Sequence, residues 1–155
     1  MSKILLSGDI QGNLDFFLEK IEILLKSSQF DLIFSVGHIL SIDYDLTPFF
    51  SGQRKIPIPI YFLEAGELGY SLMDLFPEGK EICPNLYFLG RSGVKNIIGL
   101  NVAWINGIES KYLETFIRKN HILYIILFYR QSLIFKLFFM SFSFMLPSIF
   151  FNFQH

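Results

Sequence analysis

The chain has 155 residues, with 13 basic and 14 acidic side chains and a formal net charge of −1. This length is enough for one domain with a buried core, and the balanced charge, without a run of Lys or Arg, argues against strong phosphate-driven binding of nucleic acid. The single cysteine, Cys83, excludes an internal disulfide framework and a cysteine-based zinc site. Only three apolar residues follow Lys3 before the first glycine turn. We therefore predict no signal peptide and expect an intracellular protein.

The beginning of the chain predicts a strand, a helix and a second strand. Residues 3–7 are mostly apolar and end at a glycine turn, which is typical of a short buried strand. Residues 14–26 place apolar side chains on one face at helical spacing, and Asn13 is a candidate N-cap. Residues 32–36 form another apolar run, which stops at Gly37. This order predicts a βαβ unit with adjacent parallel strands.

Shorter elements are predicted further along the chain. Residues 43–57 are expected to form a loop with one helical turn, and residues 58–63 a third strand. A short helix is predicted at residues 68–76, and strands at residues 86–89 and 101–105. The predicted fold class is therefore α/β or α+β, a layered sheet with flanking helices.

Three turns follow predicted strands directly, at the edge where open α/β sheets collect their functional groups. They are Gly8-Asp9-Ile10-Gln11-Gly12, Gly37-His38 and Glu64-Ala65-Gly66-Glu67. A two-metal phosphoesterase needs oxygen and nitrogen ligands that hold two cations about 3.5–4 Å apart. Calcineurin-like phosphoesterases supply them from an Asp-x-His turn, a Gly-Asp turn, an Asn-His turn and later histidines.

This chain departs from that ligand pattern at most positions. Asp9 is present, but Gln11 replaces the first histidine and His38 replaces the second aspartate. No asparagine or histidine occurs near Gly66, where the Asn-His turn would fall. We interpret four positions as vestiges of a metal site: Asp9, Gln11, His38 and Gly66.

We accordingly expect no catalytic residue and no cofactor. The alternative is a rewired site in which Asp9, His38 and either Glu64 or Glu67 hold one zinc or manganese ion. The start of the first predicted helix also offers a phosphate-facing turn, formed by Gly8, Gly12 and Asn13. No Gly-x-Ser-x-Gly elbow or P-loop occurs in the sequence.

Five segments carry a family resemblance: residues 4–12, 30–37, 57–63, 85–94 and 99–110. In this order they resemble the start of the CwfJ family, the CWF-nineteen-like proteins associated with the spliceosome and the RNA lariat debranching enzyme. The resemblance covers about residues 4–112 and implies a metallophosphoesterase-like amino-terminal domain with degraded metal ligands. Family members tend to carry Gly-Ala-Asn where this chain has Glu64-Ala65-Gly66, and they continue into carboxyl-terminal domains to which no segment of this sequence corresponds.

The resemblance implies a non-catalytic domain of a spliceosome or intron-lariat turnover factor that acts by protein interaction in the nucleus. The implied partners are spliceosomal or lariat debranching proteins, and we expect no direct RNA binding by this fragment. A residual metal-dependent phosphoesterase is the alternative function.

The composition changes near residue 118, because nine of the nineteen Phe residues follow it. We therefore divide the chain into a partial metallophosphoesterase-like domain, residues 1–118, and an apolar Phe-rich tail, residues 119–155, outside the family fold. A tail rich in Phe, Ile and Leu is what AT-rich noncoding or frame-shifted DNA would encode, and we interpret the tail in this way. Neither apolar run of the tail, residues 122–129 or 137–151, reaches the ~18 uninterrupted apolar residues of a membrane span. A membrane-tethered fragment is nevertheless an alternative interpretation.

Overall fold

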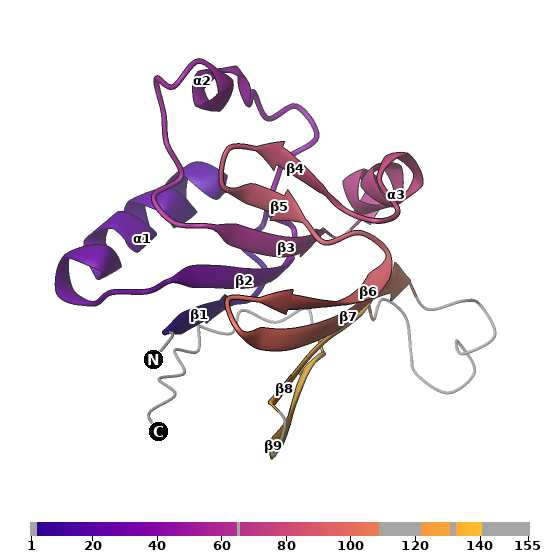
Figure 1. Ribbon diagram of the computed structural model, residues 1–155. Coiled ribbons are helices and arrows are strands. Elements are labelled where there is room, and N and C mark those ends of the chain that lie inside the picture. Colours follow the sequence, from indigo (N-terminus) through magenta and orange to yellow (C-terminus); the bar gives the residue numbers. More distant parts are fainter. Residues whose placement is uncertain (1–2, 65, 109–121, 131–132, 141–155) are drawn as a thin grey trace.

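Two sheets and three helices form the part of the chain that the structure describes (Figure 1). The computed structural model describes residues 3–64, 66–108, 122–130 and 133–140, with residues 66, 107, 108 and the last two segments described by their backbone alone. The elements in chain order are β1 (Ile4–Ser7), α1 (Leu14–Ser27), β2 (Leu32–Gly37), α2 (Thr47–Phe50), β3 (Ile60–Glu64), α3 (Gly66–Leu75), β4 (Lys80–Cys83), β5 (Leu86–Phe88), β6 (Ser92–Ile97), β7 (Leu100–Ile108), β8 (Ile122–Arg130) and β9 (Leu133–Met140).

The first sheet has five strands in the order β1-β2-β3-β5-β4. Strands β1, β2, β3 and β5 are parallel, and β4 runs antiparallel to β5 at the edge. The predicted βαβ unit is confirmed, because α1 joins the adjacent parallel strands β1 and β2. The parallel order brings the carboxyl ends of β1, β2 and β3 to one edge of the sheet.

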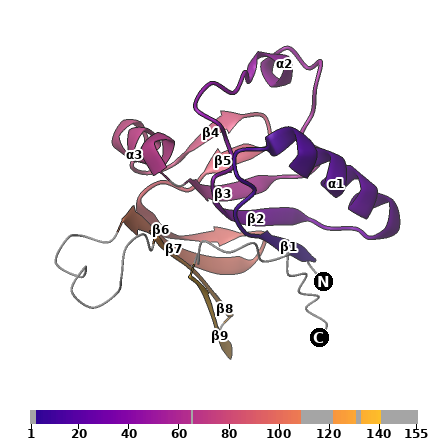
Figure 2. The same ribbon diagram turned by 180° about the vertical axis from the view of Figure 1, so that it is seen from behind.

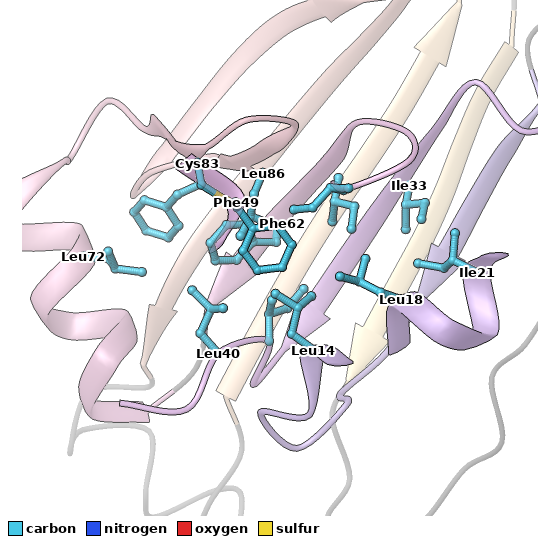
Figure 3. Close-up of a cluster of buried hydrophobic side chains, with 14 of the residues drawn as sticks. Leu14, Leu18, Ile21, Ile33, Leu40, Phe49, Phe62, Leu72, Cys83 and Leu86 are labelled. Carbon is cyan, nitrogen blue, oxygen red and sulfur yellow. The ribbon is translucent and has the colours of Figure 1, made fainter. Parts of the chain in front are cut away.

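One face of this sheet is covered by the three helices. Successive side chains of a strand point to opposite faces, so Leu5 and Ile33 meet the helices while their neighbours point away. The apolar face of α1 packs here together with Phe49 of α2 and Leu72 of α3 (Figure 3). Asn13 begins α1 as predicted, since its side-chain oxygen accepts the Phe16 N–H at 3.1 Å.

The other face packs against a second, antiparallel sheet in the order β6-β7-β8-β9 (Figure 2). Leu6 and Phe34 of the first sheet share a buried cluster with Ile97, Val102 and Trp104 of the second. The described residues therefore form three layers: helices, a mostly parallel sheet and an antiparallel sheet. The predicted fold class, a layered α/β sheet with flanking helices, is confirmed.

The element boundaries differ from the prediction in a few places. The third strand begins at Ile60 rather than residue 58, because Pro59 has no N–H for the ladder. Helix α3 begins at Gly66, two residues before the predicted start. Strands β4 and β6 were not predicted, since both expose polar side chains and show no clear alternation.

Part of the apolar tail lies in the second sheet. The β8 backbone pairs antiparallel with β7, and β9 pairs antiparallel with β8. The domain boundary predicted at residue 118 and the tail residues 141–155 lie outside the described residues. Within the described part of the chain, no helix is long and apolar enough to cross a membrane.

Candidate functional site

A cleft of about 530 Å³ lies at the carboxyl ends of β1, β2 and β3. Three segments line it: the turn after β1, the loop after β2 and the start of α3. The lining residues are Gln11, Gly12, His38, Leu40, Ser41, Ile42, Glu67 and Leu68. The cleft therefore lies at the edge of the sheet where the sequence predicts functional groups.

Asp9 joins the first two of these segments through its carboxylate. Its Oδ1 accepts the Gln11 N–H at 2.7 Å and the His38 N–H at 3.1 Å. The Gly12 N–H in turn donates to the His38 carbonyl at 2.8 Å. These three hydrogen bonds fix the turn after β1 against the loop after β2, so Asp9 has a structural role here.

Gly37 allows the close approach of the Asp9 turn. Its φ of +119° lies in a region that L side chains rarely adopt, and a Cβ here would lie 2.6 Å from the Asp9 Cα. Any side chain at this position would push the two turns apart. The geometry of the cleft wall therefore depends on glycine at the end of β2.

The predicted phosphate-facing turn is mostly occupied by its own hydrogen bonds. The Gly12 N–H donates to His38, and the Asn13 N–H donates to the Ile10 carbonyl at 3.1 Å. Asn13 and Gly8 are not among the residues that line the cleft. Two of the three backbone amides proposed for phosphate are thus already paired inside the protein.

Glu64 is a buried carboxylate behind the cleft. Its residue is 1% exposed, and its oxygens accept the Ile39 N–H at 3.1 Å and the Leu40 N–H at 3.2 Å. The same carboxylate lies 3.5 Å from the Nδ1 of His38, whose side chain is 46% exposed. Glu64 therefore holds the loop after β2 and lies beside the only imidazole that lines the cleft.

The described residues do not fit the metal pair of a phosphoesterase. No group of three or more His, Cys, Asp or Glu side chains among them is arranged to hold a metal ion. Asp9 and Glu64 both accept backbone N–H groups, and Gln11 is a poor ligand for a transition metal. His38 and Glu64 come together, whereas the full rewired trio with Asp9 does not form a site.

Four of the cleft residues were not predicted from the sequence: Leu40, Ser41, Ile42 and Leu68. Three of them lie within five residues after Gly37, at the end of β2. Their position directly after a parallel strand is the sequence signal that points to them. Leu40 is 6% exposed and its side chain points into the helix-side core (Figure 3), which anchors this loop.

Comparison with known proteins gives the chain clear relatives. It is 36% identical over 121 residues to a CWF19-like protein 1 homolog of Caenorhabditis elegans, covering 74% of this chain and 22% of that protein. CWF19-like protein 1 of Mus musculus is 30% identical over 112 residues, covering 70% of this chain and 21% of its own length. The chain is a homologue of the CWF19-like proteins.

The same comparison extends to a protein named for lariat debranching. The lariat debranching enzyme of Schizosaccharomyces pombe is 29% identical over 118 residues, which cover 65% of this chain and 26% of the enzyme. No family profile matches the chain. The CWF19-like homologue described here spans only about a fifth to a quarter of the length of these relatives.

Proposed function

We propose that this CWF19-like homologue is a non-catalytic domain that acts by protein interaction in splicing and intron-lariat turnover, in the nucleus. The observation that carries the proposal is the use of Asp9 and Glu64, whose carboxylates accept backbone N–H groups around the cleft. Relatedness to CWF19-like proteins and to a lariat debranching enzyme supports the process. Its partners are accordingly components of the splicing or debranching machinery.

The absence of catalysis is tested with the purified chain, manganese or zinc, and a chromogenic phosphodiester. We expect no bound metal after dialysis and the same hydrolysis rate for the wild type and Asp9→Ala. Stoichiometric metal together with hydrolysis that Asp9→Ala abolishes would establish the alternative, a residual metal-dependent phosphoesterase.

The interaction role is tested by affinity purification of the tagged chain from nuclear extract. We expect splicing or debranching proteins to be enriched over a tag-only control and to remain after ribonuclease treatment. Loss of all of them after ribonuclease would show that RNA, rather than protein contact, links the chain to this machinery.

A further inference from the structure

The residues that line the cleft include one carboxylate, Glu67, and no Lys or Arg side chain. Glu67 is exposed and lies at the start of α3. The carboxylates of Asp9 and Glu64 add negative charge close to the His38 backbone and side chain. This charge favours a cationic ligand and repels phosphate, which disfavours RNA at this place.

Glu67 is the one carboxylate among the residues that line the cleft. A carboxylate only accepts hydrogen bonds, so a ligand group that pairs with Glu67 must donate them. His38 lines the cleft beside the buried carboxylate of Glu64, which is 3.5 Å from its Nδ1.

The cleft also has an apolar part that a bare metal ion would not need. Leu40, Ile42 and Leu68 line it beside the acceptors, and Ile42 is 66% exposed. The volume of about 530 Å³ is far larger than one ion and lies within the range of ligand pockets. A long side chain with an apolar stem and a cationic tip matches both parts.

We propose that this cleft binds a peptide segment of a protein partner by a lysine or arginine side chain with an adjacent apolar residue. The ammonium or guanidinium group donates to Glu67, and the apolar groups pack on Ile42 and Leu68. This inference rests on the proposed role in protein interaction and names the kind of segment that is recognised.

The test uses the full chain and two fluorescein-labelled peptides of sequence Gly-Leu-Lys-Leu-Gly, one with free lysine and one with acetylated lysine. Acetylation removes the charge but keeps the stem. We expect fluorescence anisotropy to show at least about tenfold tighter binding of the free lysine, a difference of about 1.4 kcal/mol. Equal binding of the two peptides would overturn the proposal.

Two variants locate the binding in the cleft. Glu67→Lys is expected to remove the preference for the charged peptide, and Glu22→Lys, the same charge change at an exposed position of α1, is the matched control. Ile42→Ser is expected to weaken both peptides by a similar factor, since it removes only apolar contact. Equal effects of Glu67→Lys and Glu22→Lys would place the binding elsewhere and contradict the proposal.

The two proposals can fail separately. If nuclear proteins are recovered and Glu67→Lys does not change them, the cleft proposal fails while the interaction role stands. If the free-lysine peptide binds in the cleft but no splicing or debranching protein is recovered, the cleft proposal stands alone. The proposal of a peptide ligand would also be overturned by RNA binding at the cleft. The evidence would be a single-stranded RNA oligonucleotide that displaces the peptide and binds the Glu67→Lys variant more tightly than the wild type.

Discussion

At the scale of single residues, two carboxylates hold the loops at the carboxyl edge of the first sheet, the exposed Asp9 and the buried Glu64. Both residues are acidic, the type that commonly binds metal ions in proteins, and the sequence pattern identifies both as candidate metal ligands. What the sequence does not reveal is that both carboxylates accept backbone N–H groups of the loop after β2. Such contacts depend on loop conformation, which a pattern of residue types does not determine.

Gly37→Ala should be strongly destabilising. The new Cβ would meet Asp9 at 2.6 Å and the backbone φ of +119° is unfavourable for alanine, so we expect a loss of about 2–4 kcal/mol in the free energy of unfolding. Gly52→Ala is the control, because its φ of +76° is also positive but nothing lies within 4 Å of its Cβ. Urea unfolding compares them, and equal losses would show that the close approach is not the cause.

At the scale of elements, the sequence predicts the helices and strands whose apolar residues recur with a regular period. Helix α1 and strand β2 are long and regular, and they lie where the apolar pattern places them. Strands β4 and β6 are held by their neighbours rather than by their own composition, so the pattern fails there. Local sequence therefore determines the central elements, while tertiary pairing determines the edge strands.

A polar cluster fixes the long loop before β3 to helix α1. Asp15 of α1 accepts hydrogen bonds from Tyr44 and Arg54, and the Arg54 guanidinium lies 5.0 Å from the centre of the Phe49 ring. The Tyr44 hydroxyl and then Arg54 lower the pKa of Asp15 below its ordinary value of 3.8. A carboxyl with a lowered folded-state pKa contributes stability above its unfolded pKa and loses it as the pH falls through the folded value.

Asp15→Asn should therefore reduce stability at pH 7 by less than about 1 kcal/mol, since the pair is partly exposed to solvent. The difference from wild type should shrink as the pH falls below about 4 and vanish once the wild-type carboxyl is also protonated in the folded state. Chemical denaturation across this pH range measures it, with Asp43→Asn as an exposed control. A difference that stays constant with pH would refute the ionic contribution.

The hairpin between β6 and β7 contains a strained residue. Ile98 has φ of +46° and precedes Gly99 with φ of +85°, and a β-branched side chain is disfavoured in this conformation. Ile98 is 48% exposed, so its replacement removes little burial. Ile98→Asn should raise the unfolding free energy by about 1 kcal/mol, measured by urea unfolding. Ile98→Val keeps the β-branch and should give no gain; an equal gain would point to a cause other than backbone strain.

At the scale of the whole molecule, the layers are covered unequally. One buried cluster lies between the helices and the first sheet and another lies between the two sheets, whereas the outer face of β6 and β7 leaves Val94 65% and Ile105 55% exposed. Side chains alternate along β7, so Val102 and Trp104 point inward while Ile105 points outward. Two exposed apolar side chains on this otherwise mixed face favour self-association of the isolated chain.

Ile105→Thr should reduce aggregation without a large change in fold stability. Its side chain is already exposed, so the free energy of unfolding should stay within about 0.5 kcal/mol of wild type, while light scattering on warming should begin later. Val102→Thr is the matched control on the same strand, because Val102 is fully buried and a hydroxyl there should cost about 1–3 kcal/mol. Equal losses of stability in the two threonine variants would contradict the exposure of Ile105. They would show that another part of the molecule covers the outer face of β7 in solution.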